Sequence, residues 1–207
     1  MYARSTTIRG NPQAMDDGIS YVRDKVMPAV LQMDGCVGLS MFYDRETGRS
    51  IVTSAWADAE TLRRTADGVR AMRERAAEIM GGPAELQEWE IAVLHRLHGI
   101  HYGACARVIW TEGDLAQLDR MVDAFRMSVI PRVAELPGLD SVSLMIDRES
   151  GRCATSVTYD CRESRKEAEA PGMALRQEFT QQMGMTVTEV AVFDVALAHL
   201  RVPETTV

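Results

Sequence analysis

The 207-residue sequence has few of the features that place a protein in a membrane or outside the cell. It contains no apolar run of about 18 residues, so no membrane-spanning helix is expected. The segment Met1–Thr7 lacks the apolar core of a secretory signal, which makes the cytoplasm the expected location. Only four cysteines occur and none belongs to a CxxC pair, so we expect reduced, mostly buried thiols rather than disulfides.

The sequence is also short of positive charge and of motifs that bind phosphate. Its net charge of −7 disfavours nucleic acid as a partner, because phosphate binding needs a basic surface. It has no glycine-rich phosphate loop, no nucleophile elbow and no carboxylate pair in a defined setting. We therefore expect no nucleic acid, no membrane and no cofactor as partners.

What the sequence does contain is an internal repeat. The segment Asp44–Arg49 (DRETGR) returns as Asp147–Arg152 (DRESGR), 103 positions later. Four earlier positions agree at the same offset: Val26, Pro28, Val30 and Gly35 return as Val129, Pro131, Val133 and Gly138. A duplication constrains the architecture strongly, because each element must satisfy two copies. We predict a first repeat over residues 1–97, a linker over 98–103, a second repeat over 104–202 and a tail over 203–207.

The first helix of each repeat is the clearest secondary-structure prediction. Apolar residues three or four positions apart define one helix face in both copies. They are Met15, Ile19, Val22, Val26, Val30 and Met33, and then Leu118, Val122, Phe125, Val129, Val133 and Leu136. Pro28 and Pro131 interrupt these faces. Because proline has no N–H to donate, a kink or break is expected at both.

A hairpin and a second helical stretch follow. In the first repeat the predicted strands are Tyr2–Arg9, Val37–Tyr43, Ser50–Trp56 and Glu85–Leu94. The loop Asp44–Arg49 joins the middle two, with Gly48 supplying a positive φ and Asp44 bonding the loop's own amides. The second helix covers about 59–80 with these residues inward: Leu62, Ala66, Val69, Met72, Ala76 and Ile79.

Two further expectations concern the second helices and the last strands. The helical twin over about 163–183 contains Pro171-Gly172, which we expect to split it into a short and a longer piece. Residues 187–198 form the last predicted strand. Because side chains alternate along a strand, four residues of the first repeat's last strand are expected to share one face. Four residues of the second repeat's last strand are expected to share the corresponding face. The sets are Trp89, Ile91, Val93 and His95, and then Phe193, Val195, Leu197 and His199.

The βαββαβ order is the ferredoxin-like arrangement. Its sheet has one face under the helices and one bare face. Both faces of these strands carry apolar residues, so the bare face needs a cover, and the second copy can provide it. The expected fold class is α+β, with two ferredoxin-like βαββαβ repeats packed sheet to sheet as an intramolecular dimeric α/β-barrel.

Several of these features occur together in a known family. The first helix has a proline near its end, Gly35 opens the second strand, and the hairpin Asp44–Arg49 follows. Trp56 then ends the third strand within Ser54–Glu60, where a helix begins. In these respects the chain resembles a tandem, fused version of the antibiotic biosynthesis monooxygenase-like proteins of the dimeric α/β-barrel superfamily. The resemblance covers essentially the whole chain, twice, and implies a pocket between sheet and helices in each repeat.

The resemblance also implies candidate activities. Members carry out cofactor-free oxygenation of aromatic polyketides or quinols, and one branch degrades haem. The haem-degrading branch usually has a histidine on the helix after the tryptophan, as axial ligand to the iron. Residues 60–80 and 163–183 contain no histidine, which argues against haem degradation. Because many members have no assigned activity, fold analogy alone does not fix the chemistry.

Two equivalent pairs of residues are candidates for the pockets. Arg4 and Arg107 lie in first strands, where a charged residue needs a partner, and Glu90 and Asp194 in the last strands are expected to provide it. Each arginine is either half of a structural ion pair or a pocket group that holds an anionic or enolate oxygen.

The aromatic residues Trp56 and Tyr159 occupy equivalent positions at the expected pocket mouths. They either cap the core or stack on a flat ligand.

The histidines form a third candidate set. His95 and His199 match near the ends of the last strands, and each is either a structural side chain or a general base. The spacing His95-x-x-His98-x-x-His101 has the look of a metal cluster. No carboxylate or thiolate pattern accompanies it, so no metal site is expected.

The first functional hypothesis is a cofactor-independent monooxygenase-like enzyme acting on a small aromatic or apolar substrate in a helix–sheet pocket. Its catalytic candidates are His95, His199, Arg4 and Arg107, and its substrate-binding candidates are Trp56 and Tyr159. The alternative is a non-catalytic ligand-binding or stress-related α/β-barrel protein. The expected partner is a small apolar or aromatic molecule, although under the alternative the protein either sequesters an apolar ligand or assembles with a partner. The chain is expected to be a self-contained pseudo-dimer, with further homo-oligomers left open.

The repeats are not expected to be functionally equal. Pro171-Gly172 and the change from Trp56 to Tyr159 alter the wall of one pocket and not the other. We therefore expect activity to be kept in one half.

Overall fold

The computed structural model describes residues 1–99 and 101–201 and shows a mixed α+β fold in which the element order repeats. The strands are β1 (Tyr2–Arg9), β2 (Cys36–Asp44), β3 (Arg49–Trp56), β4 (Ala84–Arg96), β5 (Cys105–Glu112), β6 (Leu139–Ile146), β7 (Arg152–Tyr159) and β8 (Thr186–Leu200). Their hydrogen-bonded order is β1-β3-β2-β8-β5-β7-β6-β4, a closed barrel. The expected α+β barrel of two ferredoxin-like repeats is confirmed. The predicted tail over 203–207 lies outside the described residues.

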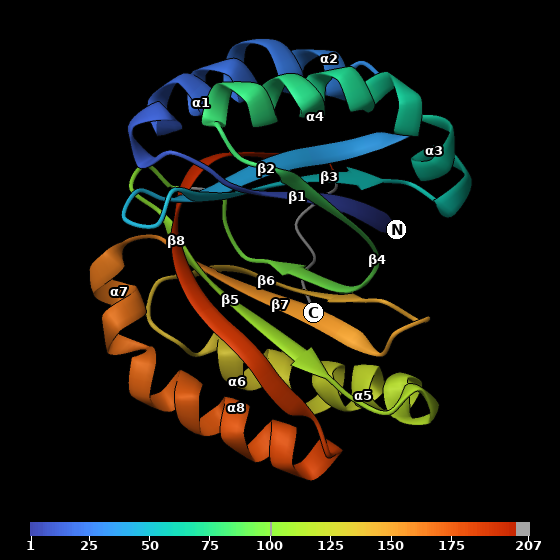
Figure 1. The fold of residues 1–207 in the computed structure, drawn as a ribbon. Helices are drawn as coiled ribbons and strands as arrows, with labels where there is room; N and C mark the ends of the chain where they lie inside the picture. The colour runs from blue at the N-terminus through green and yellow to red at the C-terminus, as the bar shows by residue number, and fades with distance from the viewer. Residues whose placement is uncertain (100, 202–207) are drawn as a thin grey trace. The chain divides into compact units, whose positions relative to one another are not determined.

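The chain divides into two compact units. The first contains Met1–Trp89 and the described residues from Asp194 onward. Its helices are α1 (Met15–Tyr21), α2 (Met27–Leu31), α3 (Ala59–Arg64) and α4 (Ala66–Met80). Within this unit α1, α2 and α4 lie over one face of β1, β3 and β2 (Figure 1). β3 pairs antiparallel with β1 on one side and with β2 on the other.

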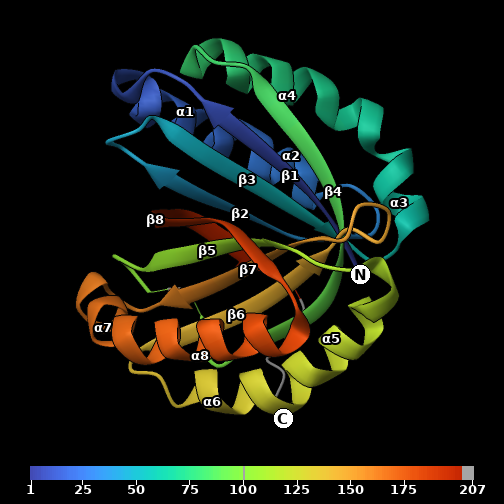
Figure 2. The same cartoon turned by 60° about the horizontal axis from the view of Figure 1, so that its bottom comes forward.

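The second unit contains Glu90–Phe193. Its helices are α5 (Leu118–Ala124), α6 (Ile130–Ala134), α7 (Arg162–Glu167) and α8 (Glu169–Met183). α5, α6 and α8 run along the same face of the sheet formed by β5, β7 and β6 (Figure 2). β7 pairs antiparallel with both β5 and β6, as β3 does with its neighbours in the first unit.

The two long strands contribute their halves to different units. β4 ends in the second unit, where Glu90–Arg96 pairs with β6. β8 ends in the first unit, where Asp194–Leu200 pairs with β2. The boundaries at 97/98 and 103/104 describe the duplication of sequence, and they stay a prediction.

The prolines in the first helices produce a specific irregularity. A π-helical segment precedes each one: η2 (Val22–Val26) before Pro28 and η4 (Phe125–Val129) before Pro131. At these segments the amides of Met27 and Ile130 bond the carbonyls five residues back. Each proline then sits in the first turn of α2 or α6, where no N–H is required. The irregularity predicted at the prolines therefore takes the form of a π-helical segment rather than a break, because the helical segments are contiguous through it.

The second helices correct one expectation. Pro171-Gly172 does not split the twin helix, because Pro171 lies in the first turn of α8, which tolerates proline. The break occurs at Ala168, and the first repeat breaks at the equivalent Thr65. The division is therefore a shared property of both repeats and does not depend on the proline.

The last strands correct another expectation. The register shifts between Ile91 and Val93, leaving Ala92 as a β-bulge, and an equivalent shift leaves Ala196 in β8. An extra residue moves the following side chains to the opposite face. Trp89 and His95 therefore do not share a face. Trp89 donates to Ser5 Oγ at 2.8 Å, whereas Val93 belongs to the core beneath the helices of the second unit.

The hairpins and the strand entries follow the prediction. Gly48 and Gly151 have φ of +70° and +75°, and the Asp44 and Asp147 carboxylates accept from loop amides at 2.9 Å. Gly35 has φ of +73° and lies against the Thr61 side chain, so a Cβ would not fit there. Among the described residues no helix is both long and apolar enough to cross a membrane.

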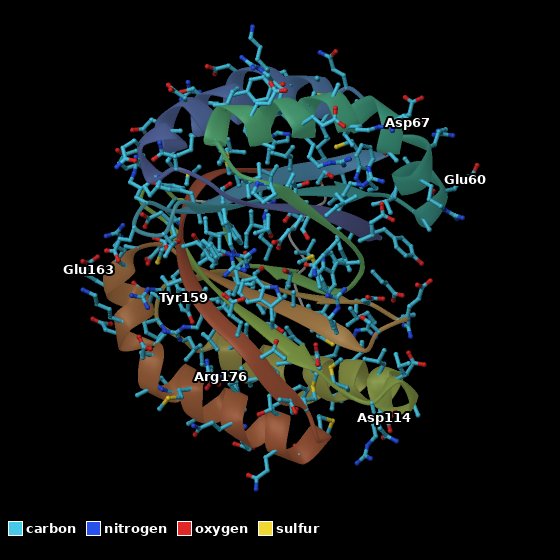
Figure 3. The ribbon with its side chains drawn as sticks, viewed as in Figure 1. Glu60, Asp67, Asp114, Tyr159, Glu163 and Arg176 are labelled. Carbon is cyan, nitrogen blue, oxygen red and sulfur yellow. The ribbon has the colours of Figure 1, made fainter. Side chains whose placement is uncertain are left out.

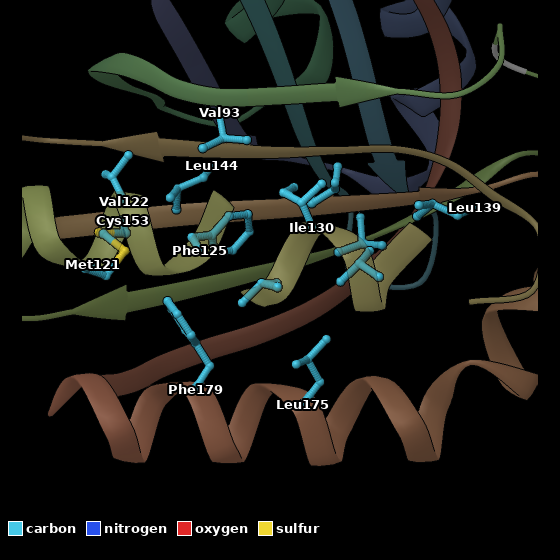
Figure 4. Close-up of a cluster of buried hydrophobic side chains, with 14 of the residues drawn as sticks. Val93, Met121, Val122, Phe125, Ile130, Leu139, Leu144, Cys153, Leu175 and Phe179 are labelled. Carbon is cyan, nitrogen blue, oxygen red and sulfur yellow. The ribbon is translucent and has the colours of Figure 1, made fainter. Parts of the chain in front are cut away.

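Each unit has its own apolar core between helices and sheet. In the second unit Leu175 and Phe179 point from α8 toward the side chains of Phe125 and Ile130 (Figure 4). Phe125 and Phe179 meet edge to face, with ring centroids 5.7 Å apart. The four cysteines are free thiols, three of them buried and Cys161 partly so.

Candidate functional site

A cavity lies between the helices and the sheet of the second unit. The volume of the cavity is about 70 Å³. The total empty volume is about 700 Å³ when the adjoining space that is open to solvent is included. Apolar side chains supply most of the wall: Ile109, Met121, Phe125, Val129, Val133, Leu136, Val142, Leu144, Val157, Leu175, Phe179 and Met185. The remaining wall is formed by Arg107, Thr111, Thr155, Tyr159, Gly172, Arg176 and Thr180. An apolar cavity with a few polar groups is the usual form of a small-molecule site.

The repeats differ at several residues that line the cavity. Gly172 occupies the position of Val69, which is buried in the first core, and Tyr159 occupies that of Trp56. A Cβ placed on Gly172 would lie 3.6 Å from Arg107 Nη1, so this glycine borders the cavity at the arginine. In the first repeat the Met80 side chain packs against Gly18. In the second repeat the position of Gly18 is occupied by Met121. Gly172 and Tyr159 are therefore smaller than their counterparts in the first repeat, whereas Met121 is larger than Gly18.

Arg107 is the charged group at the sheet side of the cavity. It lies in β5 and is 4% exposed. Its Nη2 lies 3.0 Å from Glu169 Oε2. The two groups form an ion pair, but the direction of the N–H bond is unsuitable for a hydrogen bond. Glu169, in the first turn of α8, is 59% exposed. A buried guanidinium thus faces the cavity with an exposed carboxylate as its ion-pair partner.

Two further arginines surround the same carboxylate. Arg165 Nη1 lies 3.5 Å from Glu169 Oε2, while its own Nε is buried without a hydrogen bond. Arg176, labelled in Figure 3, lies on α8 and lines the cavity. Its guanidinium forms no hydrogen bond or ion pair with any residue that the structure describes, whereas its backbone carbonyl accepts from Thr180 Oγ1 at 2.9 Å. Burial and the neighbouring Arg107 lower the pKa of Arg176, while Glu169 opposes this shift. Arginine nevertheless remains protonated at neutral pH, so the cluster is positively charged.

Tyr159 brings a phenol to this charged end. It ends β7 and is 1% exposed. Burial raises the pKa of the Tyr159 phenol, and the guanidinium groups of Arg107 and Arg165 act against this rise. The phenol is therefore neutral at pH 7 and can donate a hydrogen bond to a ligand oxygen.

The structure places the other predicted site residues elsewhere. His95 is buried in the second unit with its Nε2 unpaired, but it is not among the residues that line the cavity. His199 is exposed in the first unit. Trp56 is fully buried, and its Nε1 donates to Ser54 Oγ at 3.0 Å. Of the six candidates, Arg107 and Tyr159 are brought together at the cavity.

The ion-pair partners predicted for Arg4 and Arg107 were wrong. Arg4 pairs with Glu88, through Nε at 3.0 Å and Nη2 at 2.8 Å, and also donates to the Leu62 carbonyl at 2.6 Å.

Glu90 instead pairs with Arg148 at 2.5 Å, and the ion pair of Arg107 is with Glu169 rather than with Asp194. Glu88 and Glu90 are two positions apart and both precede the bulge, so they share one face of the strand. The pairing register decides which of them reaches Arg4, and that residue is Glu88.

Sequence reasoning missed Arg165, Glu169 and Arg176, although a signal existed. Arg165 and Glu169 replace Leu62 and Ala66, two inward positions of the first repeat's helix. Charged residues at positions that are apolar in the other copy mark a changed environment. Among the described residues no group of three His, Cys, Asp or Glu side chains is placed to hold a metal ion.

Comparisons with solved structures show the same fold. A candidate monooxygenase of Lactobacillus acidophilus NCFM is 11% identical with a TM-score of 0.73, covering 97% of this chain and 96% of that one. An anthrone oxidase-like protein is 12% identical with a TM-score of 0.65, covering 99% and 94%. A ferredoxin-fold protein of Listeria monocytogenes 4b F2365, related to antibiotic biosynthesis monooxygenases, is 9% identical with a TM-score of 0.54, covering 94% of both chains.

Sequence comparison identifies nearer relatives. No family model matches the chain. The uncharacterised protein Rv2557 of Mycobacterium tuberculosis (strain ATCC 25618 / H37Rv) is 42% identical over 204 residues, which cover 99% of this chain and 91% of Rv2557. Rv2558 of the same strain is 44% identical over 205 residues, covering 99% and 87%. Identity of this extent over the full fold establishes common descent: the chain belongs to the family of the mycobacterial proteins Rv2557 and Rv2558.

Proposed function

We propose that this chain is a cofactor-independent monooxygenase-like enzyme whose substrate, a small aromatic molecule with an acidic oxygen, binds in the cavity of the second repeat. The observation that carries the proposal is the cavity itself, in which Arg107, Arg176 and Tyr159 are polar groups in a largely apolar wall. The solved structures of candidate monooxygenases share the fold and support the reaction class. We further propose that the chain is a cytoplasmic tandem fusion of two antibiotic biosynthesis monooxygenase-like domains.

The cavity's chemistry suits a substrate that reacts as an anion. A guanidinium beside a bound enol or phenol favours its ionised form and so lowers its pKa. Tyr159 donates a hydrogen bond to the same oxygen. The apolar wall keeps water away from the resulting carbanion-like ring, which reacts with O₂. With anthrone, the ring methylene becomes a carbonyl that takes one oxygen atom, and the other oxygen atom leaves as water.

Oxygen uptake tests the proposal directly. The full chain with anthrone is expected to consume one O₂ per anthraquinone formed, at a rate unaffected by EDTA. Arg107→Met should lower the rate roughly tenfold, because the anion loses its nearest charge. Its pH profile should move to higher pH. Arg4→Met, the equivalent change in the first repeat, should leave the rate unchanged. An anthrone rate equal to that without protein contradicts the proposal.

A non-catalytic ligand-binding protein is the second candidate, and one observation favours it. Among the described residues that line the cavity none is an aspartate, a glutamate or a histidine, so no side chain there serves as a general base near neutral pH. Under this alternative anthrone binds without oxygen uptake. Native mass spectrometry of the purified protein would then show a retained apolar ligand.

A further inference from the structure

The charge balance at the cavity indicates what its ligand carries. Arg107, Arg165 and Arg176 surround one carboxylate, that of Glu169. The side chains of Arg107 and Arg165 are 5% and 14% exposed, so water does not compensate their charge. A buried charge without a partner is unfavourable, and these three positive groups share one negative group.

The first repeat shows what a balanced arrangement looks like. There Arg4 is held by Glu88 and by the Leu62 carbonyl. On β8 the position of Glu88 is taken by Val192, and Leu62 is replaced by Arg165. The second repeat has therefore exchanged a strand carboxylate for a helix carboxylate, Glu169 in place of Ala66, and has gained one cation. Nothing in the requirements of the fold demands this change, because the first repeat forms the same elements without it.

We infer that the ligand of the second repeat is an apolar or aromatic carboxylic acid, whose carboxylate binds Arg107 and Arg176 and displaces Glu169. The inference rests on the proposed function in that the ligand occupies the same cavity. Glu169 is 59% exposed, so it can turn to solvent when a ligand arrives. The guanidinium groups are held from β5 and α8 and offer the planar, paired donors that match a carboxylate. The apolar wall receives the body of the acid.

The test compares 2-naphthoate with its neutral counterpart 2-naphthamide by isothermal titration calorimetry on the full chain at pH 7.5. We expect naphthoate to bind at least about tenfold more tightly, as charge-assisted hydrogen bonds require. Arg176→Met and Arg176→Gln should each abolish this preference while changing naphthamide affinity by less than about twofold. Arg73→Met, at the equivalent position of the first repeat, should leave both affinities unchanged.

The Glu169→Gln variant gives the most specific test of whether Glu169 competes with the ligand. If Glu169 competes with the ligand carboxylate, the variant should bind naphthoate several-fold more tightly and naphthamide with unchanged affinity. Equal affinity for the two probes, retention of the preference in both Arg176 variants, or a loss on Glu169→Gln overturns the inference and leaves the cavity as an apolar site. Binding of neither probe overturns both the inference and the proposed site. Melting temperatures within a few degrees of the wild type confirm that each variant is folded.

Discussion

Arg4 and Arg107 occupy the same position in the two repeats but are held in different ways. Arg4 is bonded by Glu88 and a helix-end carbonyl in a repeat whose core is filled by Trp56 and Val69. Arg107 pairs with an exposed glutamate and borders a cavity. The same buried cation is therefore held within the core of one repeat and lines a cavity in the other, where we propose that it binds the ligand.

The comparison separates the features that both repeats share from those that only the second repeat has. The helix faces, hairpins and π-helical segments are the same in both copies, because every copy must fold. Four departures lie on α7, α8 and the end of β7 in the second repeat: Arg165, Glu169, Gly172 and Tyr159 replace Leu62, Ala66, Val69 and Trp56. Each departure either enlarges the space or adds charge beside it.

The two repeats should differ most in how much stability they lose when Trp56 or its counterpart Tyr159 is truncated. Trp56→Ala should lower the free energy of unfolding by about 3–5 kcal/mol, because a fully buried indole leaves a cavity and Ser54 loses its donor. Tyr159→Ala should cost about 2 kcal/mol, since part of its ring already borders empty space. Urea denaturation of both variants measures the difference. An equal or larger loss for Tyr159→Ala would show that the second repeat is packed as tightly as the first.

Alkaline pH should distinguish the repeats through Cys153, whose counterpart is the non-ionising Ser50. Burial raises the pKa of the Cys153 thiol from 9.0 to about 11. The folded state thus binds this proton more tightly than the unfolded state. The stabilisation is present below pH 9 and is lost as pH rises through about 11. Between those values the wild type should lose about 2 kcal/mol more stability than Cys153→Ala. Parallel pH profiles from urea denaturation would refute a buried thiol.

Gly172→Val transfers the filling residue of the first repeat to the second. The new Cβ would lie 3.6 Å from Arg107 Nη1, an ordinary contact, so the fold should tolerate the change. The valine methyl groups should occupy the cavity and weaken naphthamide binding at least about tenfold, or roughly 1.4 kcal/mol. Val69→Ile is the control in the first repeat. Calorimetry showing unchanged affinity in Gly172→Val would place the ligand elsewhere.

The arginines themselves should give the smallest effect. Arg4→Met removes a donor from the Leu62 carbonyl and should cost about 1–2 kcal/mol, discounted because Glu88 is 43% exposed. Arg107→Met should change stability by less than about 0.5 kcal/mol, because it also removes repulsion toward Arg176. Chemical denaturation of the two variants makes the comparison. The reverse order would mean that Arg107 is the structural member of the pair.

The fold was accessible from sequence because its signals are local and occur twice. The helix face that runs from Met15 to Met33 has the spacing of one stripe, and a proline at the same place in both copies locates the irregularity. The hairpin at Asp44–Arg49 depends on its own turn chemistry alone. Such features need no knowledge of the neighbours in space.

Only part of the candidate site could be predicted from the sequence, because the rest depends on contacts between distant segments. Arg107 and Tyr159 stand out as a strand cation and a strand-end aromatic, and both reach the cavity. The partners of the arginines depend on the register between neighbouring strands and on which helix turn faces the sheet. The bulge at Ala92 reverses the direction of the side chains that follow it, so simple alternation placed His95 on the wrong face.

A crystal structure of the full chain grown with 2-naphthoate would show where the carboxylate of an aromatic acid binds. The ring should lie in the second repeat between α8 and the sheet, with its carboxylate within hydrogen-bond distance of Arg107 and Arg176 and with Glu169 turned toward solvent. The space around Trp56 in the first repeat should hold no ligand. A naphthoate bound beside Trp56, or one in the second repeat whose carboxylate faces away from the arginines, would contradict the account.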